Sequence, residues 1–225
     1  MKKCNHHPSQ DLLRLHASGD ADLALSIIVS AHLDFCPQCR DKIADIEQQN
    51  AEQMLLQPET EMPNFESMMS GILQQQQIAT SPETKPSSAQ IVLEGRCFDL
   101  PRVLSRHQQR IEAWRRIPGK LHRAKIPAAV NGQLDLLHMD TQAQLPEHTH
   151  KGQEYTLVLH GEFSDDNGVY SAGDLLVKGP NDSHQPRTNT TQDCLCLTYL
   201  DAPLHFKSGL ASLLNPFSQY FFDKN

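Results

Sequence analysis

The sequence predicts an α + β multidomain protein, with an all-α helical bundle that carries a zinc site at its N-terminus and an antiparallel β-barrel at its C-terminus. Apolar residues recur at helical spacing over the first 76 residues. From about residue 114, short apolar or alternating segments are separated by glycine and proline turns. Between them, the stretch ATSPETKPSSAQ has the composition of a linker. We therefore expect a helical domain over 1–76, a linker with a possible short helix over 77–108 and a barrel domain over 109–225.

Capping residues mark the first three expected helices. Ser9 can cap a first helix that ends at Gly19, and Asp20 or Asp22 can open a second. A third helix begins near Pro37, because proline is accepted at the first helical position, and it continues towards residues 55–56.

A fourth helix carries an apolar stripe. Its members are spaced i, i+3, i+4, i+7 and i+8, which is the spacing of one helical face: Phe65, Met68, Met69, Ile72 and Leu73. Methionine is flexible and adapts to irregular contacts. The stripe is consistent with closure of the helical domain's own core, with a reversible contact to a partner, or with both.

The barrel is expected from short strands in the second half of the chain. The strand-like segments are LDLLHM, EYTLVLHGEF, GVYSAGDLLV and CLCLTYL. The run from Asp165 to Gly168 separates two of them and is a strong hairpin signal. Many short strands joined by such turns are typical of an antiparallel barrel or jelly roll.

The acidic charge of the chain is concentrated in its first part. The chain has 27 acidic and 20 basic residues, a net charge of −7, and residues 1–89 contribute twelve acidic and six basic residues. This balance argues against a protein that mainly binds nucleic acid, so we expect no direct DNA binding. An acidic domain suits a partner with a basic surface, and a solvated acidic face has the same composition.

We expect a cytoplasmic protein with no membrane contact. No stretch approaches the ~18 apolar residues that span a bilayer. The first residues, MKKCNHHPSQ, lead into no apolar segment of the signal-peptide type. Six cysteines in such a compartment favour thiols and metal sites over a disulfide framework.

A first candidate metal site lies around the sequence HLDFCPQC. His32 and Cys36 are four residues apart, which places them on one helical face, and Cys39 follows in a Cys-x-x-Cys turn. A fourth ligand is available from His6-His7. Two thiolates and two imidazoles neutralise a tetrahedral zinc ion, and a metal held by separate helices contributes to folding. A redox-active Cys-x-x-Cys pair and a pair of buried cysteines without metal are the alternatives.

A second candidate metal site lies in the expected barrel. His148, His150 and Glu154 can point inward from a strand, and His184 returns about thirty residues later. Three imidazoles and a carboxylate can bind zinc, iron, manganese or nickel. The alternative is a set of unrelated, solvent-exposed histidines.

The second set resembles the first motif of the cupin family. The motif consists of His-x-His, three residues, Glu154, six residues and Gly161, and Gln142 stands where a glycine is usual. The second cupin motif is matched more loosely, by Gly173 and His184. The departures concern turn geometry more than the ligands.

Both sets in this order resemble the ChrR-type zinc-binding anti-sigma factors. The phrases that carry the resemblance are HHPSQDLL, SAHLDFCPQCR, WRRIPG, EHTHKGQE and DCLCLTYLDAPLHF. The resemblance implies an N-terminal zinc domain that sequesters a sigma factor of the extracytoplasmic-function type, and a cupin-like metal-binding domain that senses oxidative stress, possibly singlet oxygen.

The resemblance also implies the ligands. The zinc ligands would be His7, His32, Cys36 and Cys39, with His7 preferred over His6 because it lies 25 residues before His32. The cupin ligands, for zinc or another divalent metal such as iron, manganese or nickel, would be His148, His150, Glu154 and His184. The protein would be a regulator and not an enzyme.

The main alternative is a cupin metal-dependent dioxygenase or another cupin enzyme with a regulatory zinc domain. A basic run could bind an anionic ligand, form a solvated face or dock the acidic helical domain: Arg102, Arg106, Arg110, Arg115, Arg116, Lys120, Arg123 and Lys125. Cys194 and Cys196 alternate on an expected strand and face one side, either as sensor thiols or as plain core residues.

Overall fold

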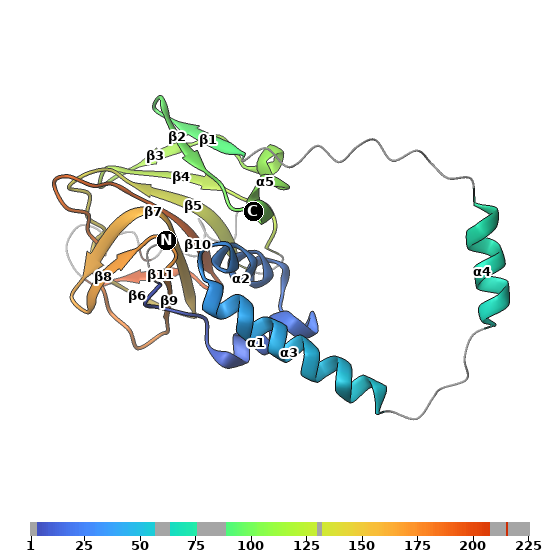
Figure 1. The fold of residues 1–225 in the computed structure, drawn as a ribbon. Helices are drawn as coiled ribbons and strands as arrows, with labels where there is room; N and C mark the ends of the chain where they lie inside the picture. The colour runs from blue at the N-terminus through green and yellow to red at the C-terminus, as the bar shows by residue number, and fades with distance from the viewer. Residues whose placement is uncertain (1–3, 57–63, 76–88, 130–131, 208–214, 216–225) are drawn as a thin grey trace.

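A computed structural model describes residues 4–56, 64–75, 89–129, 132–207 and Asn215. The chain begins with the helices α1 (Gln10–Ser18), α2 (Leu23–Phe35) and α3 (Pro37–Leu55), which we call the helical part. A further helix, α4 (Phe65–Gln74), lies away from them and from the sheets in Figure 1. The α + β fold class is confirmed.

The helices begin and end at the predicted capping residues. The side chain of Ser9 accepts a hydrogen bond from the Leu12 N–H, and Gly19 ends α1 with a φ of 78°. Asp22, one of the two predicted candidates, caps α2. Cys36 caps α3, in which proline occupies the first position.

The second half of the chain is a set of antiparallel strands, which we call the sheet part (Figure 1). The strands are β3 (Arg115–Ile117), β4 (Leu121–Lys125), β5 (Gln133–Met139), β6 (His148–His150), β7 (Glu154–Asp165), β8 (Gly168–Ser171), β9 (Leu175–Lys178), β10 (Cys194–Leu200) and β11 (Leu204–Phe206). The larger sheet has the order β3-β4-β5-β10-β7-β8, with β9 on β7, and β6 pairs with β11. Within the described residues these sheets do not close into one continuous barrel, and the arrangement is that of a cupin jelly roll.

The prediction of a linker over 77–108 is wrong for residues 89–108, which contain a hairpin and a short helix. Residues 76–88 lie outside the described residues, but β1 (Gln90–Leu93) and β2 (Arg96–Asp99) form a hairpin, and α5 (Arg102–Ser105) is the predicted short helix. Leu93 and Phe98 of the hairpin and Leu104 of α5 are buried in the largest core. The hairpin is stabilised by packing against an apolar face of the sheet. This packing cannot be recognised from the short sequence of the hairpin alone.

The largest core, which we call the main core, joins the helical and sheet parts. Ile27 and Ile28 of α2 pack in one cluster with sheet residues such as Leu157 and Leu197. The opposite face of the sheet holds a second cluster, with Val158 and Cys196 among its members. The sheet therefore has two buried faces, one covered by α2 and the β1–β2 hairpin and the other lining the cupin interior.

A salt bridge outside the main core also links the two parts. The Arg102 side chain donates to Asp34 of α2, with a nitrogen–oxygen distance of 2.6 Å at its closest, and the Arg102 backbone N–H donates to the same carboxylate at 2.8 Å. The sequence left three roles open for the basic run: binding an anionic ligand, forming a solvated face and docking the acidic helical domain. Arg102 has the docking role, because it pairs with Asp34. No described helix is both long enough and apolar enough to cross a membrane.

Candidate metal centres

The first predicted site is assembled where α2, α3 and the N-terminal segment meet. His7, His32, Cys36 and Cys39 each offer a ligand atom, and these atoms lie within 4.8 Å of one another. His7 Nδ1 is 3.4 Å from both the Cys36 Sγ and the Cys39 Sγ. In a tetrahedral zinc site, imidazole nitrogen and thiolate sulfur are separated by roughly 3.5 Å. These four residues, which we call the N-terminal cluster, therefore fit a zinc ion.

His32 is held in the tautomer that a metal ligand needs. Its Nδ1–H donates to the Gly173 carbonyl oxygen at 2.8 Å, and because a carbonyl only accepts, the lone pair is left on Nε2. His32 Nε2 is buried and makes no hydrogen bond. An orphaned lone pair that faces two thiols and an imidazole is the expected state of a ligand atom in a metal site.

Burial favours the neutral forms of His32 and Cys39. Burial lowers the pKa of His32 to about 4, so the imidazole is uncharged at neutral pH. Burial also raises the pKa of the Cys39 thiol to about 12. A bound metal cation would reverse the preference of Cys39 for its protonated form, because a thiol that coordinates a metal loses its proton. Cys4, for which the sequence predicts no role, is buried against Cys36.

The second predicted site lies inside the cupin sheets. His148 and His150 come from β6, Glu154 opens β7, and His184 forms an isolated bridge with His148. Their ligand atoms also lie within 4.8 Å of one another, and we call these residues the cupin cluster. All three histidines are buried. The alternative of exposed, unrelated histidines is therefore wrong.

The Nε2 atoms of two histidines in the cupin cluster face each other. His148 Nδ1–H donates to the Pro146 carbonyl oxygen at 2.8 Å, which leaves the lone pair on Nε2. The Asp165 carboxylate lies 3.5 Å from His184 Nδ1, and His184 Nε2 faces His148 Nε2. These two Nε2 atoms are 3.0 Å apart. A proton on His184 Nε2 would be shared with the His148 lone pair, and a metal ion in place of that proton would bind both Nε2 atoms.

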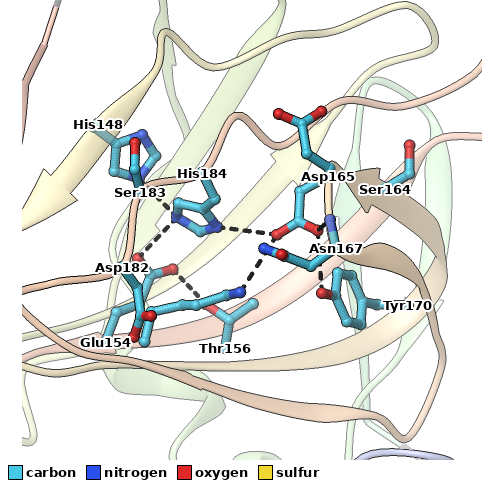
Figure 2. A network of polar contacts seen from close by, with 12 residues as sticks. His148, Glu154, Thr156, Ser164, Asp165, Asn167, Tyr170, Asp182, Ser183 and His184 are labelled. Carbon is cyan, nitrogen blue, oxygen red and sulfur yellow. Dashed lines mark hydrogen bonds and ion pairs between the residues drawn. The ribbon is translucent and has the colours of Figure 1, made fainter.

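Hydrogen bonds keep the carboxylate of the cluster ionised. Burial acts to raise the pKa of Glu154, but the imidazoles of His150 and His184 outweigh it and hold that pKa well below its usual range. Glu154 Oε2 contacts His150 Nε2, and Thr156 donates its hydroxyl to Oε1 at 2.6 Å. Figure 2 shows His184 between Glu154 and Asp165. The set fits a divalent metal.

A small cavity adjoins the cupin cluster. Its volume is about 70 Å³, and its lining includes His148, Glu154, His184 and Cys196, together with apolar side chains. Pockets for organic ligands usually enclose roughly 300–1,000 Å³, so this space suits water, dioxygen or a small anion better. Cys194 and Cys196 lie on the same buried face, as predicted, with their sulfur atoms 3.5 Å apart.

The comparisons with known proteins cover both parts of the chain. Residues 110–203 match the family model described as the ChrR cupin-like domain. The anti-sigma-E factor ChrR of Cereibacter sphaeroides is 29% identical over 214 residues, which cover 94% of this chain and 97% of that protein. This chain is similar to ChrR over almost its whole length. The resemblance inferred from the two motifs is therefore confirmed.

The fold is matched as well. A chain from the crystal structure of Rhodobacter sphaeroides SigE in complex with the anti-sigma ChrR is matched with a TM-score of 0.71 at 25% identity, over 88% of this chain and 100% of that one. An RmlC-like cupin protein from Ralstonia eutropha is matched over 48% of this chain and 80% of its own, with a TM-score of 0.39 and 15% identity. The likeness to the ChrR chain extends over 88% of this chain.

Sequence analysis missed two features of these sites. Asp174 accepts hydrogen bonds from the backbone N–H groups of Asn5 and His6, at 2.6 and 3.0 Å, and so fixes the segment that carries His7. A third group of possible ligands consists of His122, His138 and Asp140. The Asp174 contact and the third group have no recognisable motif, because each arises from strand register and long-range packing. Their local signal is limited to the His-x-Asp spacing of His138 and Asp140.

Proposed function

We propose that this protein is an anti-sigma factor that sequesters a sigma factor of the extracytoplasmic-function type. The observation that carries the proposal is the similarity to ChrR, an anti-sigma factor, across both the helical and the sheet part. A ChrR relative was crystallised in complex with SigE. The helical domain over 1–76 would bind the partner, and the cupin-like domain over 109–225 would control it. Since a sigma factor acts on cytoplasmic RNA polymerase, the protein would work there.

Exposed apolar side chains on α3 and α4 supply a docking surface. None of the side chains of α4 is buried, and Phe65 and Met68 of its stripe are 64% and 52% exposed. Leu55 at the end of α3 is 86% exposed. Apolar groups gathered in this way mark an interaction site. The interpretation of the stripe as a partner contact is thus favoured over closure of the helical part's own core.

Zinc in the N-terminal cluster would give the helical part its shape. It would join the segment before α1 to α2 and α3 through His7, His32, Cys36 and Cys39. Structural zinc contributes folding free energy on the order of 10 kcal/mol in small domains. In the cupin cluster the metal would be zinc or another divalent ion such as iron, manganese or nickel, since three imidazoles and a carboxylate accept each of them.

Co-purification with a sigma factor encoded nearby tests the proposal. The full chain should retain the sigma factor, and His32→Ala or Cys36→Ser should lose it, because the helices lose their common metal. Cys97→Ser is the matched control, since Cys97 is exposed and belongs to neither cluster. A Cys36→Ser variant that holds the sigma factor with unchanged affinity would remove the N-terminal cluster from the mechanism.

The cupin-like domain would sense the oxidative signal. The link to the helical part is the turn at Gly173 and Asp174, between β8 and β9. Gly173 accepts the His32 hydrogen bond, and both residues are bonded through the backbone to Val158 on β7, the strand that begins at Glu154. A change at the cupin cluster that moved β7 would therefore reach the N-terminal cluster. Oxidation of Cys36 and Cys39 is a second point of entry, because thiolates on zinc remain oxidisable.

Release of the bound sigma factor tests the sensing role. Exposure of the purified complex to singlet oxygen should free the sigma factor. His184→Ala should keep sigma binding but abolish this release, since it changes only the cupin cluster. Release that is unaltered by His184→Ala would assign sensing to the N-terminal thiols instead.

A cupin dioxygenase is the second candidate function. The small cavity disfavours it, because the described lining includes no arginine or lysine to bind an anionic substrate and leaves little room for an organic one. The relative matched over 94% of the chain is an anti-sigma factor. Oxygen uptake with a thiol or enol substrate by the full chain would favour the enzyme.

A further inference from the structure

A third cluster of possible ligands lies on the sheet face that the β1–β2 hairpin covers. His122 of β4 and His138 of β5 are directly opposite each other in the antiparallel register, so their side chains leave the same face. Asp140 follows β5. One ligand atom from each of these three residues lies within 4.8 Å of the others. This third cluster is separate from the cupin cluster, which lies in the cupin interior.

Each imidazole of the third cluster has a carboxylate on its outer nitrogen. His138 Nε2 is 2.7 Å from Asp193 Oδ2, and His122 Nε2 is 3.3 Å from Glu94 Oε1. Asp193 accepts the His138 Nε2–H, and the nearby Glu94 carboxylate favours a proton on His122 Nε2, which leaves the Nδ1 lone pairs for a ligand role. Metal-binding histidines are oriented by this arrangement in other proteins.

Both inner nitrogens are buried and lack a hydrogen bond. His122 Nδ1 and His138 Nδ1 are among the buried atoms without a hydrogen-bond partner, and the two side chains are 5% and 3% exposed. Asp140 Oδ1 lies 3.9 Å from His122 Nδ1 and 3.4 Å from His138 Nδ1. Tetrahedral zinc holds nitrogen and oxygen ligands roughly 3.4 Å apart. Two lone pairs and a carboxylate oxygen therefore converge on one point.

The surroundings suit a cation. Glu94, Asp140 and Asp193 bring three carboxylates, and Arg96 pairs with one of them, Asp193. The Asp140 side chain is 31% exposed, which leaves a path from solvent and an open coordination position. The hairpin turn that carries Glu94 lies over the site, and Phe98 of β2 packs against the His138 ring with centroids 5.4 Å apart.

We propose that His122, His138 and Asp140 bind a zinc ion, through His122 Nδ1, His138 Nδ1 and a carboxylate oxygen of Asp140, with solvent in the fourth position. The ion joins β4 to β5, and through the contact of His122 Nε2 with the Glu94 carboxylate it fixes the turn of the β1–β2 hairpin. The site is independent of the proposed sigma binding, because it shares no residue with the N-terminal cluster or with the exposed stripe of α4.

Metal counting on the full-length protein tests this site. The purified chain is titrated with zinc sulfate, and bound zinc is counted by elemental analysis and native mass spectrometry. Asp140→Asn should bind one zinc ion fewer than the unmodified chain, or bind it at least tenfold more weakly, because it loses a charged ligand. Asp166→Asn is the matched control, since Asp166 is 78% exposed and pairs with Arg187 instead.

A second variant keeps the test decisive. His122→Gln should lose the same single equivalent as Asp140→Asn, with an unchanged far-UV circular dichroism spectrum, and combining the two substitutions should cause no further loss. Equal zinc content and equal affinity in the unmodified chain, Asp140→Asn and His122→Gln would overturn the proposal. The test compares the zinc content of the variants with that of the unmodified chain. The comparison therefore does not depend on which metal the N-terminal and cupin clusters contain.

Discussion

Gly173 is a point of close contact between the sheet part and the helical part. Its φ of 96° favours glycine, and a Cβ there would lie 2.6 Å from the Cys4 sulfur and 2.9 Å from the Phe35 Cβ. Its carbonyl oxygen fixes the tautomer of His32. One backbone position thus serves the turn, the packing of the two parts and the N-terminal cluster.

Substitution of Gly173 should loosen this contact. Gly173→Ala should lower the free energy of unfolding by roughly 1–3 kcal/mol, through backbone strain and displacement of the His32 hydrogen bond, and should weaken zinc binding in the N-terminal cluster. Urea unfolding and zinc content measure both effects. Gly168→Ala is the control, because a Cβ at Gly168 meets nothing within 4 Å. Equal losses in the two variants would contradict this role of Gly173.

Asp174 predicts an acid-dependent weakening of the same contact. Burial acts to raise the pKa of Asp174, but the backbone N–H groups of Ser171, Asn5 and His6 outweigh it and hold that pKa below its usual value of 3.8. A carboxyl whose pKa is lower in the folded state stabilises the protein fully above pH 3.8 and loses this contribution as the pH falls through the folded pKa.

A pH series of urea unfolding measures this contribution. Asp174→Asn should be less stable than the unmodified chain at neutral pH by about 1–3 kcal/mol, because the buried N–H groups lose a charged acceptor. The difference should shrink as the pH falls below about 4. Parallel stability profiles for the two proteins would show that Asp174 is not the titrating group.

At the scale of elements, α4 differs from α1, α2 and α3 because none of its side chains is buried. Its stripe has the same spacing as a core-facing helix, but none of its side chains is buried. Packing within the part of the chain that the structure describes therefore does not account for the apolar character of this face, and a partner contact does. The N-cap Asn64 and the acidic Glu66 in the first turn support the helix locally.

Polar substitutions on α4 should separate binding from stability. Met68→Ser combined with Ile72→Ser should weaken sigma-factor binding at least tenfold, because both side chains are exposed in the free protein and would be buried in the complex. The free energy of unfolding should change by less than about 0.5 kcal/mol. Ser67→Ala on the same helix is the control. Calorimetric titration with the sigma factor gives the affinity, and unchanged binding would place the docking surface elsewhere.

The elements with local signals could be predicted from the sequence, and those that depend on distant partners could not. Ser9, Asp22 and Pro37 define helix starts through hydrogen bonds to their own neighbours, and the cupin ligands follow a fixed spacing. The β1–β2 hairpin was missed because its strands have four residues each and its burial depends on the sheet below.

The candidate sites divide in the same way. The N-terminal and cupin clusters were visible because most of their ligands are close in the chain, whereas His122 and His138 meet only through strand register. Gln142, which departs from the cupin motif, adopts a φ of 57°, which is the region where glycine is usual. The substitution of the usual glycine by Gln142 therefore affects the turn, whereas the four cupin ligands still lie together.

At the scale of the whole molecule, α2 belongs to both parts. Its Ile27 and Ile28 are buried in the main core against the sheet, while His32 on the same helix enters the N-terminal cluster. Fully burying such side chains contributes about 1.5–3 kcal/mol each. The helical part is therefore attached to the sheet by a continuous core and not only by a linker.

Zinc removal should destabilise both parts together. Chelation should lower the melting temperature of the full chain by roughly 10 °C or more, since several kcal/mol of binding free energy are lost. The helical circular dichroism signal and the fluorescence of Trp114, the single tryptophan, should change in one coincident transition. Trp114 reports on the sheet part, because it packs on the main core and donates to the Val92 carbonyl oxygen at 3.1 Å. Two separate transitions would contradict the shared core.

The position of α2 limits how such proteins can diversify. A helical part transplanted onto an unrelated cupin would meet a surface not shaped for Ile27 and Ile28, and the recipient's own outer layer would have no place for them. Replacement of either part alone would leave Ile27 and Ile28 without a complementary surface, so the two parts can change only together at this contact.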